Sequence, residues 1–140
     1  MTESVRRLAF GFVNAYLIQG RAGCVLIDTG MTLHRARLAQ ALDEAGCGPG
    51  DLGLVVITHG DPDHSGNAAY VRATYGAKIA MHALEAPAVE RGDMFRSRSR
   101  TPLGRRLLKP LTGLFQLRRR DRFTPDVFLE DGDRLDAYGL

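Results

Sequence analysis

Cysteine is scarce in this chain, which has two, Cys24 and Cys47, among 140 residues. Two cysteines are too few for a disulfide framework, and their apolar or glycine-rich surroundings predict buried thiols rather than a metal pair. An apolar run long enough to cross a membrane is also missing. Residues 8–18 alternate, contain Asn14 and lack a small-residue cleavage site, so they predict a strand and not a secretory signal. We therefore expect a cytoplasmic protein.

A strong excess of either charge is absent from the chain as a whole, whose formal net charge is +3. Residues 91–122 are the exception, because they hold eleven basic side chains against Asp93 and Asp121, a local charge of +9. The remainder then carries −6, so the basicity does not predict a specific nucleic-acid-binding protein.

The basic stretch also has leucines near helical spacing, with a proline and a glycine interrupting them. The leucines are Leu103, Leu107, Leu111 and Leu114. One interpretation is an amphipathic segment that contacts an anionic membrane surface, or a cap that attracts an anionic substrate. The other is an insert whose leucines pack on the domain and whose arginines are solvated, and we favour this second interpretation slightly.

Two imidazoles and two carboxylates lie within six residues, between His59 and His64. They follow residues 54–57, an apolar and β-branched run that predicts a buried strand, and a glycine and a proline mark the loop after it. Imidazole and carboxylate are the usual ligands of a borderline divalent cation such as zinc. The predicted metal ligands are His59, Asp61, Asp63 and His64.

Helix capping and turn formation offer an alternative for the same residues. Asp63 or Ser65 is a candidate N-cap for a helix over 66–71, and Asp61 with Pro62 is typical of a turn. A cap, however, requires one such residue, whereas this segment has four ligand-type side chains at the end of a strand. We therefore favour metal binding.

The predicted elements follow one another in the order typical of a layered α/β domain. Strands over 12–19 and 24–28 flank a short glycine-bounded hairpin loop. A helix is expected to begin at Thr32 and to end near Ala45. The motif strand and its helix come next, followed by a strand over 78–81 and a short helix over 85–90. With 44% hydrophobic residues, residues 1–140 can form one domain with a real core, and 91–122 is an insert within it.

The polar cluster and its surroundings resemble the metallo-β-lactamase superfamily. Residues 58–66 are similar to its H-x-H-x-D-H signature, in the variant with Asp61 in place of the second histidine. Residues 25–30 are similar to the early strand with its aspartate-containing loop, and 77–82 to the strand after the motif helix. Residues 129–133 are similar to the turn before the next ligand-bearing strand. The resemblance implies the N-terminal half of an αββα sandwich, a mixed sheet with outer helices.

The resemblance also implies how the ligands are divided between two metal ions. His59 and Asp61 would hold the first ion, and Asp63 and His64 the second, with a water or hydroxide between them as nucleophile. Asp63 is also the residue that we assign to catalysis. One or two zinc ions are expected, and the extra carboxylate of Asp61 leaves manganese or iron open. Asp28, which ends a core strand at the same edge, would orient a ligating imidazole.

Histidine is missing from the second part of the chain, where none follows His82. The resemblance implies two further histidines and a bridging aspartate downstream of the motif. We therefore expect an apparently truncated domain whose open sheet face is covered by a missing C-terminal half, by a second copy in a homo-oligomer, or by rearrangement. His34 is expected at the surface or an interface, and His82 is expected to be structural.

Two functions remain open at this point. The first is a metal-dependent hydrolase in which metal-bound hydroxide attacks an ester, thioester, lactone or related bond of a small molecule, anionic or lipid-like. The second is a truncated, non-catalytic metal-binding or interaction protein completed by a partner chain. The absent histidines favour the second and the intact motif favours the first. With two protein ligands for each site, we expect the chain alone to bind zinc weakly and to turn over little.

Overall fold

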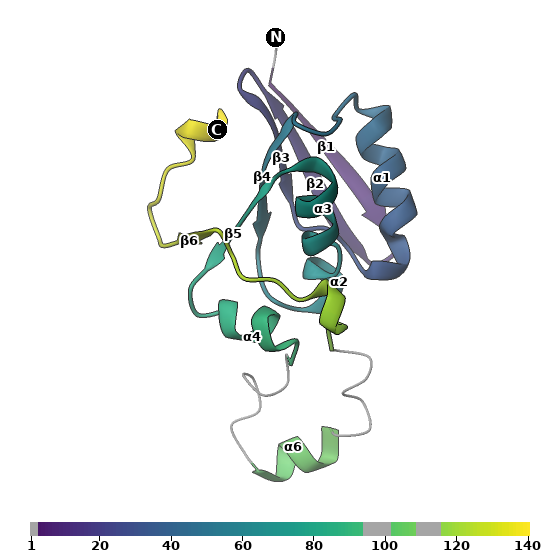
Figure 1. The fold of residues 1–140 in the computed structure, drawn as a ribbon, viewed down its shortest axis with the longest axis vertical. Helices are drawn as coiled ribbons and strands as arrows, with labels where there is room; N and C mark the ends of the chain where they lie inside the picture. The colour runs from purple at the N-terminus through teal and green to yellow at the C-terminus, as the bar shows by residue number, and fades with distance from the viewer. Residues whose placement is uncertain (1–2, 94–101, 109–115) are drawn as a thin grey trace.

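A six-stranded mixed sheet forms the centre of the molecule in the computed structural model, which describes residues 3–93, 102–108 and 116–140 (Figure 1). The strands are β1 (Ser4–Phe10), β2 (Val13–Gly20), β3 (Gly23–Ile27), β4 (Leu52–Ile57), β5 (Lys78–His82) and β6 (Val127–Leu129), in that spatial order. The pairs from β1 to β3 are antiparallel and those from β3 to β6 are parallel. The predicted α/β class, a mixed sheet with helices, is confirmed.

The strand predicted over residues 8–18 is in fact two strands. The chain reverses after Phe10, and β1 then pairs with β2 in an antiparallel hairpin. Gly11 makes this reversal possible, because its φ of 77° lies in the left-handed region that favours glycine. The alternation of apolar residues continues on both sides of the turn, which is why the pattern alone did not show the break.

The helices are short, and the sequence predicts a helix after each of β3, β4 and β5. They are α1 (Arg35–Glu44), α2 (Pro62–Ser65), α3 (Ala68–Tyr75), α4 (Ala86–Arg91) and α6 (Pro102–Leu108). The helix predicted from Thr32 begins with a 3-10 turn, Thr32–His34, before α1. Among the described residues, further 3-10 turns cover Arg119–Asp121 and Asp136–Tyr138.

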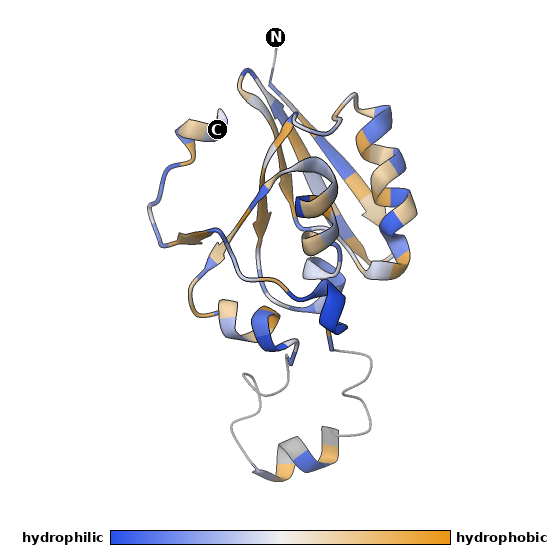
Figure 2. Cartoon of the chain, viewed as in Figure 1, coloured by the Kyte–Doolittle hydropathy of each residue, from blue (hydrophilic) through white to orange (hydrophobic). Residues whose placement is uncertain are grey.

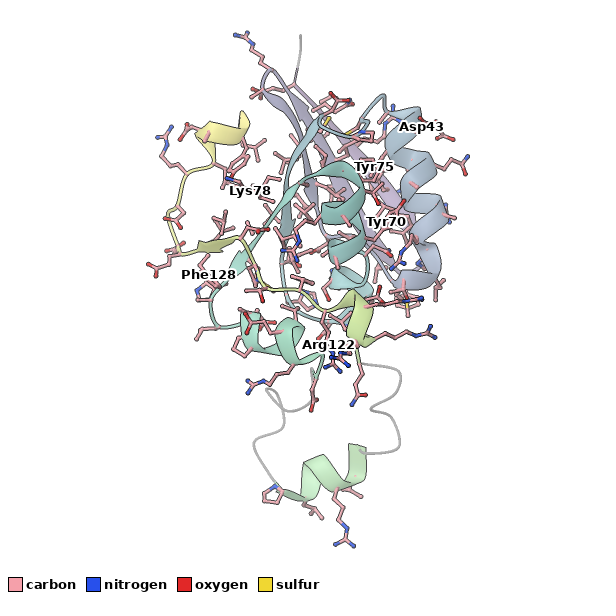
Figure 3. The ribbon with its side chains drawn as sticks, viewed as in Figure 1. Asp43, Tyr70, Tyr75, Lys78, Arg122 and Phe128 are labelled. Carbon is pink, nitrogen blue, oxygen red and sulfur yellow. The ribbon has the colours of Figure 1, made fainter. Side chains whose placement is uncertain are left out.

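The main core lies on one face of the sheet, under α1 and α3. Alternate strand residues point into it, and α1 contributes Leu38 and Leu42, neither of which is exposed to solvent. Apolar residues are concentrated in the strands, while α1 shows polar residues along its outer side (Figure 2). Tyr70 and Tyr75 lie on the side of α3 toward α1, with ring centroids 6.4 Å apart in an edge-to-face arrangement (Figure 3). Cys24 and Cys47 are buried free thiols, as predicted.

The opposite face of the sheet carries a smaller apolar cluster around Val25, Leu54 and Ala80. Leu135 and Tyr138, from the last residues of the chain, pack against this cluster. The sheet face that we expected to lie open is therefore covered in part by these two residues.

The parallel register of β3, β4 and β5 decides where the polar residues meet. Parallel strands have their carboxyl ends at one edge of the sheet, and ligands in open α/β folds bind outside that edge. Asp28 directly follows β3, the motif follows β4, and a turn from His82 to Glu85 follows β5. Three loops are thereby brought together at one place.

Much of the basic stretch lies outside the described residues, including Leu111 and Leu114. Within the described part, Leu103 and Leu107 of α6 are 67% and 69% exposed. The expectation that these two leucines pack on the domain is therefore wrong. Among the described helices, we find none with the length and apolar character needed to cross a bilayer.

Candidate metal centre

The motif occupies the loop after β4 and the single-turn helix α2. Asp61 is the N-cap of α2 in an extended conformation, and Pro62 follows at the start of the helix, where its fixed φ suits the first turn. Asp63 and His64 then lie on α2 itself, while His59 remains on the loop. This turn folds the motif back on itself, so that residues from its two ends meet.

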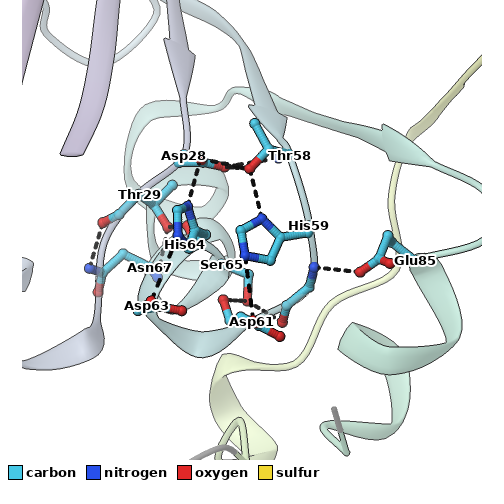
Figure 4. A network of polar contacts seen from close by, with 11 residues as sticks. Asp28, Thr29, Thr58, His59, Asp61, Asp63, His64, Ser65, Asn67 and Glu85 are labelled. Atoms are coloured by element: carbon cyan, nitrogen blue, oxygen red, sulfur yellow. Dashed lines mark hydrogen bonds and ion pairs between the residues drawn. The ribbon is translucent and has the colours of Figure 1, made fainter. Parts of the chain in front are cut away.

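The donor atoms of His59, Asp63 and His64 all lie within 4.8 Å of one another. The two imidazole centroids are 4.0 Å apart, and Nε2 of His64 lies 3.7 Å from Oδ2 of Asp63 (Figure 4). Asp61 stands beside this group, with Oδ2 3.5 Å from Nε2 of His59. The predicted ligands are thus neighbours, and imidazole–carboxylate contacts join His59 to Asp61 and His64 to Asp63. The division of these ligands between two ions stays a prediction.

Asp28 and Thr58 each form a hydrogen bond with one of the two imidazoles, in both cases at Nδ1. Nδ1 of His64 lies 2.8 Å from Oδ2 of Asp28, and Nδ1 of His59 lies 3.0 Å from Oγ1 of Thr58. The Thr58 hydroxyl donates its proton to the Asp28 carboxylate, at 2.8 Å from Oδ2, so it can only accept from His59. Both contacts place a proton on Nδ1, and in the neutral imidazole this leaves the Nε2 lone pair of each ring available to a cation.

This donor set fits a divalent cation. Zinc takes histidine nitrogen and carboxylate oxygen, and two ligands that are each about 2.0–2.2 Å from one ion lie at most about 4.4 Å apart. The three donors of the compact group need only a small adjustment to reach that spacing. His59, Asp63 and His64 would hold an ion here, with Asp61 adjacent.

The backbone of Asp28 is in the left-handed region, with a φ of 60°, and it is the one non-glycine residue with positive φ in the described part of the chain. Asp tolerates this region better than most residues but still at a cost, and such residues concentrate at functional sites. The whole residue is 5% exposed, and its backbone N–H donates to the carbonyl of Val56 at 2.9 Å. The unusual backbone turns the carboxylate toward Thr58 and His64.

A family model described as the metallo-beta-lactamase superfamily matches residues 8–139. The chain belongs to this superfamily. "Metallo-beta-lactamase domain-containing protein 1" of Rattus norvegicus is 41% identical over 70 residues, which are 48% of this chain and 28% of the rat protein. The Homo sapiens protein of the same name is 46% identical over 57 residues, 41% of this chain and 21% of the human protein.

Solved metallo-β-lactamases share the fold of the chain. BJP-1, a subclass B3 metallo-beta-lactamase of Bradyrhizobium japonicum, superposes with a TM-score of 0.76 at 19% identity, over 95% of this chain and 45% of that one. Native FEZ-1 of Legionella gormanii gives 0.73 at 17% identity, over 94% and 45%. The chain thus spans less than half the length of these structures, and the matched segments cover less than a third of the two named relatives.

Within this metallo-β-lactamase fold, Thr29 and Asn67 fasten the Asp28 loop to the motif. The N–H and the hydroxyl of Thr29 both donate to the carbonyl of His64, at 2.7 and 2.9 Å. The Asn67 amide donates to the carbonyls of Thr29 and Met31, at 2.9 and 2.8 Å. Gly66 allows the close approach, because a Cβ there would lie 2.9 Å from the carbonyl oxygen of Gly30 and 2.9 Å from the backbone nitrogen of Thr32.

The alternative of helix capping does not account for Asp63 or Ser65. The N-cap of α3 is Asn67, and neither α2 nor α3 has a capping bond from its N-cap side chain. The Ser65 hydroxyl instead donates back to the carbonyls of Gly60 and Asp61, at 2.9 and 3.0 Å.

The other two histidines lie outside the compact group. The exposed His82 accepts a hydrogen bond from the N–H of Leu84 at its Nδ1, a local structural role. His34 is half-buried and stacks on Phe10 with ring centroids 5.5 Å apart, so the expectation of a surface or interface side chain is wrong in part. Its Nδ1 is buried and has no hydrogen-bond partner among the described residues.

Sequence reasoning missed Thr58, Thr29, Asn67 and Glu85 as supports of the site. Thr58 and Asn67 flank the motif, and their types suit hydrogen bonding, but their partners lie 30 or more residues away. No sequence pattern around Glu85 indicates a role at the site, because its loop is brought to the motif only by the pairing of β4 with β5.

Proposed function

We propose that the chain is the metal-binding part of a metal-dependent hydrolase that acts on an ester, thioester, lactone or related bond of a small molecule. The observation that carries the proposal is the common orientation of His59 and His64, each held at Nδ1 and each with Nε2 left for a cation. A bound divalent cation would lower the pKa of water and polarise the bond under attack. Zinc is the expected ion, with manganese or iron as further candidates.

The residues of the chain have separate parts in this proposal. Asp28 and Thr58 orient the imidazoles, and Asp61 lies close enough to His59 to complete the coordination. Asp63, a member of the compact group with a side chain that is 31% exposed, would help to hold the ion and is the carboxylate that we assign to catalysis.

Metal titration with matched histidine variants tests the proposal. Calorimetry with zinc, manganese and iron(II), each alone, would give stoichiometry and affinity for the 140-residue chain. His59→Ala and His64→Ala should each lose most of the zinc affinity, whereas His82→Ala should bind as the wild type does. Equal affinity in all four proteins would overturn the proposed site.

Turnover separates the hydrolase from a non-catalytic metal-binding protein completed by a partner chain. The metal-loaded chain should hydrolyse at least one of a panel of aryl esters, thioesters and lactones, slowly, because the chain supplies few ligands for each ion. Metal uptake without turnover on the whole panel would favour the alternative function.

We also propose that α6 contacts an anionic membrane surface. Leu103 and Leu107 are one helical turn apart and largely exposed, and they lie within the stretch of net charge +9. The chain should then co-sediment with vesicles of phosphatidylserine and phosphatidylcholine, and less with phosphatidylcholine alone. A Leu103→Ser, Leu107→Ser double variant should bind less, and unchanged binding would refute the contact.

A variant with Arg118, Arg119 and Arg120 changed to Gln tests the role of the positive charge in the basic stretch. Its turnover of anionic substrates or its vesicle binding should fall.

A further inference from the structure

Gly60, the residue between His59 and Asp61, is buried and is held at both ends of its backbone. Its N–H donates to Oε2 of Glu85 at 2.8 Å, and its carbonyl accepts from the hydroxyl of Ser65 at 2.9 Å (Figure 4). A glycine has no side chain that could fix its position, and its backbone is the most adaptable of any residue. The two hydrogen bonds therefore fix a segment that the sequence itself leaves free.

The two partners of Gly60 come from different elements. Ser65 ends α2 and is fully buried, so its hydroxyl is fixed by the motif helix itself. Glu85 precedes α4 and belongs to a turn closed by the bond from its own N–H to the carbonyl of His82, at 3.0 Å. Because β4 and β5 are parallel neighbours, this turn lies directly beside the loop that carries His59.

We propose that Glu85 is a positioning residue of the metal centre, acting through the Gly60 amide to fix His59 and Asp61 relative to each other. Glu85 is not a member of the compact group that the described residues form. Its Oε2 is occupied by an N–H, and hydrogen bonds to an ionised carboxylate are among the stronger ones. Ser65 assists from the opposite side. The inference rests on the proposed metal site and adds a residue that neither the motif nor its resemblance contains.

The two possible modes of action of Glu85 predict different results for two variants. If Glu85 acts through its hydrogen bond, Glu85→Gln should substitute for it, because a Gln side-chain oxygen also accepts from an N–H. If it acts only by adding negative charge near a cation, Glu85→Gln should be as defective as Glu85→Ala. Glu90, exposed on the neighbouring helix, offers a control through Glu90→Ala.

The experiment measures zinc affinity, by competition with a chromophoric chelator, and the visible absorption spectrum of the cobalt(II)-loaded full chain. Glu85→Ala should weaken zinc binding about 10- to 100-fold, the range found when outer partners of metal ligands are removed, and should change the cobalt spectrum. Glu85→Gln should restore both to near the wild-type values, and Glu90→Ala should match the wild type. Ser65→Ala should shift both readouts in the same direction as Glu85→Ala, and it serves as the test if Glu85→Ala does not fold.

The failures can be told apart. If the wild type binds metal and Glu85→Ala has the same affinity and spectrum, the role of Glu85 is overturned and the proposed metal centre is unaffected. A Glu85→Gln variant as weak as Glu85→Ala would overturn action through the hydrogen bond. Absence of metal uptake in the wild type would overturn the proposed function and this inference with it.

Discussion

Oδ2 of Asp28 lies 2.8 Å from Nδ1 of His64, so the residue directly after β3 sets the orientation of an imidazole on α2, the helix after the next strand. The same carboxylate accepts from the backbone N–H and the hydroxyl of Thr58. One buried acid thereby controls the direction of both histidines in the compact group. The centre depends on a residue outside the motif as much as on the motif.

Asp28→Asn should weaken zinc binding about 10- to 100-fold, because the amide presents a donor where the carboxylate accepts. Asn tolerates the left-handed backbone as Asp does, so the change tests the side chain and not the φ of 60°. Zinc titration with chelator competition measures the effect, and Asp43→Asn on the exposed side of α1 is the control. Wild-type affinity in Asp28→Asn would contradict the orienting role.

Asn67→Ala should lower the free energy of unfolding by about 1–3 kcal/mol, because it leaves buried carbonyls without their donor. The side chain is fully buried and donates to the carbonyls of Thr29 and Met31. Urea unfolding followed by circular dichroism measures the change. Asn14→Ala, at a half-buried position of β2, should change stability much less, and equal effects in the two variants would contradict the fastening role.

Arg35 connects Asp121, near the end of the basic stretch, to Asn67, which follows the motif. The effects of mutating Arg35 and Asp121 on stability should therefore be coupled. Its Nε donates to Oδ1 of Asn67 at 3.1 Å and a terminal nitrogen donates to Oδ1 of Asp121 at 2.8 Å, while its guanidinium lies 4.9 Å from the centre of the Tyr70 ring. A double-mutant cycle of Arg35→Ala and Asp121→Ala should give a coupling of about 0.5–3 kcal/mol in urea unfolding.

Arg35→Lys should not preserve these two hydrogen bonds, because an ammonium cannot donate in two fixed directions as the planar guanidinium does. Full stability in Arg35→Lys, or additivity in the cycle, would show that the contacts are incidental. Arg37→Ala, exposed on the same helix, provides the control.

Burial, followed by a hydrogen bond and charge interaction with Cys24 and the charge of Asp51, raises the pKa of the Cys47 thiol from its usual 9.0 to about 12. The folded chain therefore keeps a proton that the unfolded chain loses, and stability from this group is complete below pH 9 and lost as the pH rises toward 12. Cys47→Ala should reduce the fall in unfolding free energy over that range. An identical fall in the variant and the wild type would contradict the prediction.

The same buried thiol should resist alkylation in the folded protein. The thiolate is the reactive form, and at pH 8 the raised pKa of Cys47 leaves very little of it. Iodoacetamide labelling followed by mass spectrometry should modify Cys47 slowly in buffer and rapidly in urea. Rapid labelling in buffer would show that the packing around Cys47 opens more readily than its burial implies.

The local parts of the fold and the site were readable in the sequence because each depends on neighbours along the chain. The strands β2 to β5 follow from short apolar runs between turn residues, and the motif brings its four ligand-type residues within six positions. The glycine and proline of the motif also indicate the sharp turn that returns His64 toward His59.

The sequence by itself determined the family, the mixed α/β architecture and the position of the candidate metal ligands after a buried strand. The tertiary structure decided which of those side chains form the compact group and which other residues hold them. Asp28, Asn67 and Glu85 reach their partners across separations of 25 to 38 positions. Such contacts exist only once β3, β4 and β5 pair in parallel, because that register is a property of the assembled sheet and no local pattern encodes it.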